Sequence, residues 1–172
     1  MFRRIRVAVV AISTALVTVL GAAPAHAAGP WFVSTTGNNA NGCLSAANAC
    51  ATIQGVLAKA GMVNGDTINV AAGTYTGTTT FSTKGANVVG PASGSPATLD
   101  GNNAASVIVM NGNVAVKLTN LTVSRGFSNG TVGAGVRVGA GALTAQNVNI
   151  INNKGNYGAG VGVANAATFT MR

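Results

Sequence analysis

Short runs of β-branched and apolar residues recur along this chain at a nearly constant spacing, and this recurrence limits the folds open to it. The spacing is about 25 residues, which is typical of one coil of a β-solenoid. An immunoglobulin-like sandwich also has many short strands, but it gives no reason for whole motifs to repeat. We therefore expect an all-β fold, a right-handed parallel β-helix. The repeated motifs are 133–138 with 158–163, 121–124 with 148–151, and 143–145 with 169–171.

The candidate strands carry an apolar residue at every second position, which is the pattern of a strand with one buried face. Glycine and asparagine separate them throughout, as expected for sharp turns between strands. The candidate strands are residues 67–70, 79–81, 87–89, 106–109, 114–118, 121–123, 135–138, 147–150, 160–163 and 168–171.

Residues 51–61 break this pattern. Apolar residues follow one another there at helical spacing, at Ile53, Val56, Leu57 and Ala60, and a glycine ends the run. The first coil of a solenoid exposes its core, so we expect this short helix to cap it. The predicted organisation is a disulfide loop and capping helix over 28–61, then β-helix coils over 62–172. The last residues fall in mid-coil, which leaves two alternatives: a β-helix truncated at the C-terminus, as the N-terminal piece of a longer protein, or a chain that pairs through its open end.

The first 27 residues have the three parts of a bacterial-type export signal. A basic start is followed by an apolar stretch over 7–20 and by the sequence Ala25-His26-Ala27. The apolar stretch is shorter than the roughly 20 residues that a membrane-spanning helix needs. We therefore predict cleavage after Ala27, a secreted or extracellular location, and no membrane span after cleavage.

The charge balance is basic, with 10 Lys and Arg residues against 2 acidic residues. The cations beyond the signal are scattered singly, so we do not expect a nucleic-acid partner. A basic protein is attracted to an acidic polysaccharide or an anionic cell surface, and we expect a partner of that kind. These cations are Lys59, Lys84, Lys117, Arg125, Arg137, Lys154 and Arg172.

The two cysteines, Cys43 and Cys50, are separated by only six residues. In an oxidising exterior, cysteines this close in a loop are expected to form a disulfide. A metal site would need further ligands. The chain beyond the signal offers no histidine and only two distant carboxylates, so we expect neither a metal nor a cofactor.

The stretch from Cys50 to Tyr75 contains a Thr-Ile-Gln segment followed by Gly-Asp-Thr-Ile and Gly-Thr-Tyr. It resembles the opening coil of right-handed parallel β-helix proteins of the pectin-lyase-like superfamily. The later Leu-Asp-Gly-Asn, Leu-Thr-Asn-Leu-Thr-Val and Gly-Ala-Gly-Val units resemble the next coils, and are similar to repeats of polymorphic outer-membrane-type adhesins. The resemblance implies the fold over nearly the whole exported chain. It does not imply one activity, because such folds carry lyases, hydrolases and adhesins.

The candidate catalytic residues are Asp66, Asp100 and Arg125. The lyases of this superfamily hold calcium on a cluster of acidic residues and use Arg or Lys as the base. This chain has only two acidic residues, Asp66 and Asp100, and they lie in different predicted coils, so they do not form such a cluster. A glycoside hydrolase needs two carboxylates across the scissile bond. Asp66 follows Asn-Gly and Asp100 precedes Gly-Asn, both ordinary turn contexts, so we assign them to turns and expect no catalytic residues.

We therefore expect a non-catalytic secreted β-helix, a surface scaffold or adhesin-like module that binds a polysaccharide or cell-surface glycan. The alternative function is a polysaccharide lyase or glycoside hydrolase of the pectin-lyase-like kind, of which this chain would be an N-terminal fragment. An unpaired strand edge pairs readily with another strand, so we also expect pairing through the C-terminal β edge.

Overall fold

The computed structural model describes residues 29–164 and 166–172, and nearly all of its regular structure is short parallel strand. The predicted export signal at 1–27 lies outside the described residues. The elements are β1 (Trp31–Val33), η1 (Ala46–Asn48), α1 (Ile53–Leu57), β2 (Thr67–Val70), β3 (Gly73–Thr76), β4 (Thr79–Phe81), β5 (Asn87–Val89), β6 (Ala97–Asp100), β7 (Ile108–Met110), β8 (Ala115–Ser124), β9 (Phe127–Val132), β10 (Val136–Val138), β11 (Ala142–Ile151), β12 (Lys154–Tyr157), β13 (Val161–Val163) and β14 (Thr168–Met171).

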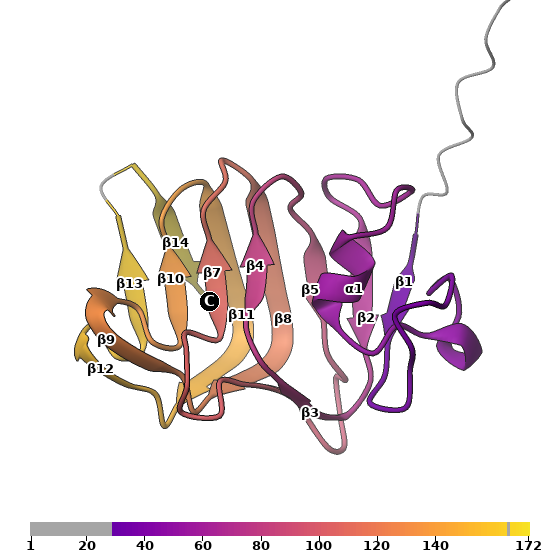
Figure 1. Cartoon of the computed structure of the whole chain (residues 1–172), viewed down its shortest axis with the longest axis horizontal. Coiled ribbons are helices and arrows are strands. Elements are labelled where there is room, and N and C mark those ends of the chain that lie inside the picture. Colours follow the sequence, from indigo (N-terminus) through magenta and orange to yellow (C-terminus); the bar gives the residue numbers. More distant parts are fainter. Residues whose placement is uncertain (1–28, 165) are drawn as a thin grey trace, which may run out of the picture.

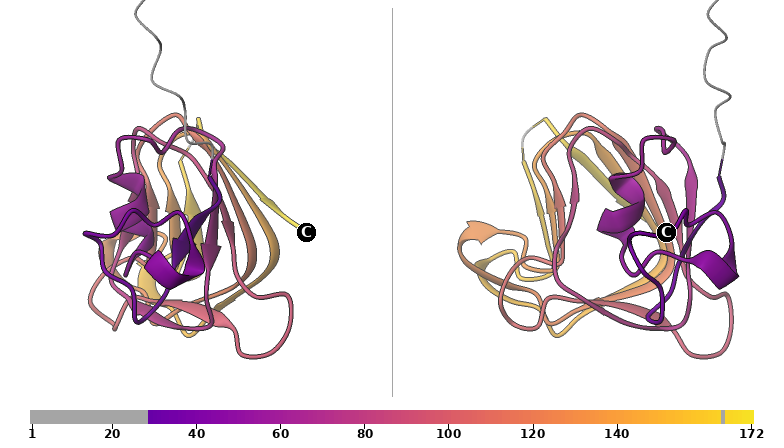
Figure 2. Two further views of the ribbon diagram at one scale, coloured as in Figure 1. Left: turned by 90° about the vertical axis from the view of Figure 1, so that its right-hand side faces the viewer. Right: turned by 45° about the vertical axis from the view of Figure 1, so that its right-hand side comes forward.

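The strands stack into a parallel solenoid of about four coils (Figure 1). Sheet A has eight strands, in the order β1-β2-β5-β8-β11-β14 with β3 and β6 beside them. Sheet B has the order β13-β10-β7-β4, and β12 pairs with β9 in a two-stranded sheet C. A view from the β1 end shows the coils lying behind one another around one interior (Figure 2). The predicted all-β parallel β-helix is confirmed.

The three repeated sequence motifs coincide with strand pairs in register. Val136 pairs with Val161, Leu143 with Phe169, and Leu121 with Val148. Each repeat is therefore one coil, and equivalent residues lie directly above one another.

The core consists of columns of apolar side chains, one residue from each coil. Ile68, Val88, Leu118 and Ala145 stand in register on neighbouring strands of sheet A, and each is 0% exposed. The residues between them on each strand face solvent. This alternation follows from strand geometry, in which successive side chains point to opposite faces.

The long strands β8 and β11 each contain a bend. We predicted two strands at 114–118 and 121–123, and the structure joins them into β8 because pairing continues on both sides of the bend. Asn120 at this bend has φ 54°, and Asn147 in the next coil has φ 51°. Asparagine tolerates this left-handed conformation better than most residues. The Asn147 side chain also donates to Oδ1 of Asn120 over 3.3 Å, so the bends are linked from coil to coil.

Helix α1 is shorter than the helix predicted over 51–61. It starts after Thr52, whose hydroxyl accepts the Gly55 N–H at 3.0 Å, and it ends at Leu57. The Lys84 ammonium donates to the Leu57 carbonyl at 3.1 Å and to the Lys59 carbonyl at 2.7 Å. These bonds satisfy carbonyl groups that have no partner in a helix that stops here.

The apolar face of α1 is buried at Ile53, Val56 and Leu57, whereas Ala60, predicted on the same face, is exposed beyond the helix end. The Gln54 side-chain oxygen accepts the N–H of Thr80 in β4 at 3.0 Å. Since β4 is the edge strand of sheet B, α1 satisfies a backbone group at that edge. Its role as a cap for the solenoid stays a prediction.

Cys43 and Cys50 form the predicted disulfide, with their Cα atoms 5.1 Å apart. The Cys50 segment adds a parallel bridge to Val33 on the outer edge of β1. In the described part of the chain, no helix has both the length and the apolarity to cross a membrane.

The alternation of sheet A gives a test on adjacent residues of β8. Replacing Leu118 with Ala should lower the free energy of unfolding by about 2–5 kcal/mol, because the side chain is completely buried in the middle of the sheet. Thr119→Ala, on the solvent side, should change it by no more than about 0.5 kcal/mol. Urea unfolding followed by circular dichroism measures both. Equal losses would contradict the assigned faces of β8.

Candidate functional site

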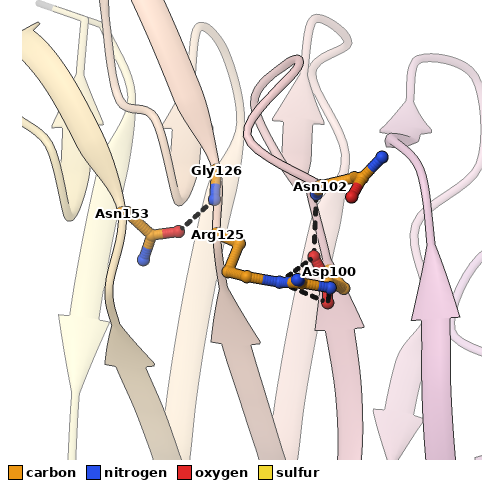
Figure 3. A network of polar contacts seen from close by, with 5 residues as sticks. All are labelled: Asp100, Asn102, Arg125, Gly126 and Asn153. Atoms are coloured by element: carbon orange, nitrogen blue, oxygen red, sulfur yellow. Dashed lines mark hydrogen bonds and ion pairs between the residues drawn. The ribbon is translucent and has the colours of Figure 1, made fainter.

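Asp100 and Arg125, two of the three catalytic candidates, are in direct contact (Figure 3). Asp100 ends β6 and is buried, while Arg125 follows β8 in the next coil. The Arg125 Nε donates to Oδ1 at 3.0 Å and to Oδ2 at 2.8 Å, and Nη2 also donates to Oδ2. The backbone N–H of Asn102 donates to Oδ1 at 2.7 Å. The carboxylate therefore binds the turn that follows it and the coil stacked on it.

The turns around this pair stack in the same way as the strands. Asp100 is in register with Ser124 and Ile151, so Gly101, Arg125 and Asn152 take equivalent positions after their strands. Arg125 has φ 52°, a conformation costly for a residue with a long side chain. Two contacts hold Arg125 in this turn, the ion pair with Asp100 and a hydrogen bond from the Asn103 N–H to the Arg125 carbonyl at 2.7 Å.

Asn153 links the same turns from the next coil. Its Oδ1 accepts the Gly126 N–H at 2.7 Å (Figure 3). Its Nδ2 donates to the Val123 carbonyl at 3.2 Å. A Cβ on Gly126 would lie 2.1 Å from the Ala134 carbonyl oxygen, so this position needs glycine. The Asn153 contacts could not be predicted from the sequence pattern, because they depend on the length of each coil.

The surroundings of Asp100 keep it ionised. The hydrogen bonds from the Arg125 guanidinium lower the pKa of this carboxyl below its ordinary value of 3.8. Burial raises the pKa, but the guanidinium and the Asn102 N–H outweigh that effect. A carboxyl that stays charged and holds an arginine cannot act as a general acid near neutral pH.

Asp66, the third candidate, lies in the turn before β2. Its Oδ2 accepts the indole N–H of Trp31 at 2.9 Å and the backbone N–H of Val63 at 3.0 Å. It therefore ties β1 to the start of β2.

The structure does not bring Asp66 and Asp100 together. Asp66 lies just before β2, the first strand of its coil in sheet A. The same coil continues into β3, which ends at Thr76. Asp100 is in register with Thr76 on the neighbouring strand β6. The carboxylates thus lie at opposite ends of the coil's strands in sheet A. Among residues 29–164 and 166–172, no group of three or more His, Cys, Asp or Glu side chains is placed to hold a metal ion.

A groove lined by both polar and apolar residues runs over the outer face of sheet A. Asn87, Lys117 and Thr144 point outward from β5, β8 and β11 at the same register position. With Asn64 and Asn113 they line a cavity of about 460 Å³, which we call the Lys117 groove. The Asn87 side chain donates to the Gly65 carbonyl at 2.8 Å, which fixes its orientation. Within the described part of the chain, the Lys117 ammonium group forms no ion pair and no hydrogen bond.

Asparagine side chains also stack outside the groove, in sheet C. The Asn156 amide donates to Oδ1 of Asn129 at 3.2 Å. Sheet C forms a lobe at the end of the solenoid away from β1 (Figure 1). These two amide groups therefore bond to each other between neighbouring coils. In the described chain β14 pairs with β11 alone, and pairing through its other edge stays a prediction.

No protein-family model, no curated protein and no solved structure matches the chain. The parallel solenoid is thus established by the strand pairing itself, without a named relative.

The Asp100–Arg125 pair should make stability depend on pH. A carboxyl with a lowered folded-state pKa stabilises the fold above its unfolded pKa, and this contribution disappears as the pH falls through the folded-state value. In Arg125→Ala the buried Asp100 loses its partner, so the variant should be less stable than the parent above about pH 5. The difference should shrink as the pH falls below the ordinary value of 3.8.

Thermal unfolding of both proteins between pH 2 and pH 7 measures this difference. Arg137→Ala is the matched control, because Arg137 lies on the outer side of β10 and has no ion pair within the described residues. A stability loss for Arg125→Ala that is the same at all pH values would contradict the role of the pair.

Proposed function

We propose that this chain is a non-catalytic, exported β-helix module that binds an acidic glycan in the Lys117 groove. The observation that carries the proposal is the groove itself. Its volume of about 460 Å³ lies within the usual range for ligand sites. Its lining combines one ammonium group, three asparagine amides and one threonine hydroxyl with valine and alanine side chains. Sugar hydroxyls are donors and acceptors that match Asn and Thr side chains, and an ammonium group attracts a sugar carboxylate.

The positions of the carboxylates support the non-catalytic part of the proposal. Asp100 holds Arg125 and Asn102, and Asp66 holds Trp31 and Val63. Both are used to connect segments of the fold, and neither lines the Lys117 groove. A glycosidase or lyase needs such groups beside the scissile bond.

Export and an extracellular location are part of the proposal. The disulfide is compatible with an oxidising compartment, and the segment that suggests a signal precedes the described residues. The resemblance to pectin-lyase-like β-helices and to adhesin repeats also supports a glycan as the partner.

The first experiment is retention of the exported chain on immobilised polygalacturonate and on uncharged dextran. We expect retention on polygalacturonate that weakens with salt, because screening reduces the attraction of Lys117 for carboxylates. Lys117→Gln should weaken the retention by about 2- to 5-fold, the scale of one exposed charge pair.

Arg137→Gln is the matched control for net charge, because it removes an outward-facing cation from sheet B rather than sheet A. It should leave retention nearly unchanged. Equal losses for the two variants would mean that binding depends on net charge alone and not on the groove. Release of reducing ends or unsaturated sugars from polygalacturonate would contradict the non-catalytic proposal.

A further inference from the structure

The loop closed by the disulfide forms one wall of a second cavity, on the outer face of β1 and β2. This cavity has a volume of about 320 Å³. We call it the disulfide-loop pocket. Its side-chain lining includes Phe32, Ser34, Ala46, Ala49, Asn69 and Ala71. Phe32 and Asn69 are in register on the two strands and face outward, because their neighbours Trp31 and Ile68 are buried in the core.

The wall of the pocket is firmly attached to the sheet. The Phe32 N–H donates to the Cys43 carbonyl and the Cys50 N–H donates to the Phe32 carbonyl, both at 2.8 Å. The Ser34 N–H donates to the Cys50 carbonyl at 2.9 Å, and the disulfide joins the two ends of the loop. Residues Ala46 and Ala49 between these ties therefore hold a fixed position beside the pocket.

The lining of the pocket contains no charged side chain. It combines an aromatic ring, Phe32, and the methyl groups of three alanines with two polar side chains, Ser34 and Asn69. The Ser34 hydroxyl is engaged with the Thr36 hydroxyl at 3.1 Å. The Asn69 side chain is half-buried, and its amide group has no hydrogen-bonding partner among residues 29–164 and 166–172. It offers a donor and an acceptor to a ligand.

We infer that the disulfide-loop pocket binds a neutral N-acetylated sugar residue. The apolar C–H face of a pyranose ring packs on the Phe32 ring, and the acetyl methyl group lies among the alanine methyl groups. The acetamido N–H and C=O pair with the Asn69 amide. A charged sugar would lose hydration here without an ion partner, which is costly, so the pocket favours a neutral residue.

This inference does not depend on the Lys117 groove. The two sites share the outer face of sheet A, but they use different strands and no common lining residue. One binds by charge and the other by apolar contact and an amide pair, so their ligands and salt dependences differ.

The test compares two β-1,4-linked trisaccharides, tri-N-acetylchitotriose and cellotriose, titrated into the exported chain. Saturation-transfer NMR should show binding of the N-acetylated sugar only, with the strongest transfer at the acetyl methyl groups. Asn69→Leu should weaken this binding by about 3- to 10-fold, the range expected for a lost neutral hydrogen-bonding partner. Asn111→Leu is the matched control on an exposed asparagine after β7, and it should bind like the parent.

Equal binding of the two trisaccharides, no binding of either, or unchanged binding in a folded Asn69→Leu protein would overturn the inference. Should Asn69→Leu fail to fold, Phe32→Leu tests the same pocket through the loss of ring stacking. Polygalacturonate retention measured on the same samples separates the two proposals. Retention without tri-N-acetylchitotriose binding would refute this inference and leave the Lys117 groove standing.

Discussion

The stacking of coils in register is the constraint on which the rest of this structure depends. Each strand of sheet A or sheet B bonds to the strand of the next coil, so a residue in one coil has a fixed partner in the next. An apolar residue at a core position must then be matched above and below it, as in the column of Ile68, Val88, Leu118 and Ala145. An insertion within a strand would shift the later residue pairs of that strand out of register. Changes of coil length are therefore accommodated in the loops between strands.

The same stacking explains where the polar residues lie. Turn residues also stand above one another, so their side chains can bond between coils as well as within one. Asn147 donates to Asn120, Asn153 bonds Gly126, and Arg125 holds Asp100. The buried carboxylate of Asp100 is thus used to connect neighbouring coils. The two proposed binding sites, the Lys117 groove and the disulfide-loop pocket, both lie on the outer face of sheet A.

The sequence predicted strands well wherever apolar and polar residues alternate. The strands at 67–70, 79–81, 87–89 and 168–171 have the bounds that their patterns indicated. Strands β3, β6, β9 and β12 were not among the candidates, because glycine, threonine and asparagine dominate most of them and give a weak periodic signal. Helix α1 was predicted too long, since nothing in the pattern shows that Lys84 satisfies the carbonyl groups at its end.

The site was less predictable than the fold. The turn contexts of Asp66 and Asp100 were visible in the sequence, and their bonds to Val63 and Asn102 are the local contacts such turns make. The partners Trp31 and Arg125 come from far along the chain, and only the coil register brings them near.

The stacking is tested by the distance between two strands of sheet A, β2 and the edge strand β14. Thr67, Asn87, Lys117, Thr144 and Thr170 form one outward column, so Thr67 and Thr170 are four strand steps apart. At roughly 4.8 Å for each step, their Cα atoms should be separated by about 19 Å. Spin labels at these two positions, measured by pulsed electron resonance, should give one narrow distribution that fits this separation after allowance for the label arms. A broad distribution, or a Cα separation beyond about 30 Å, would contradict the stacked solenoid.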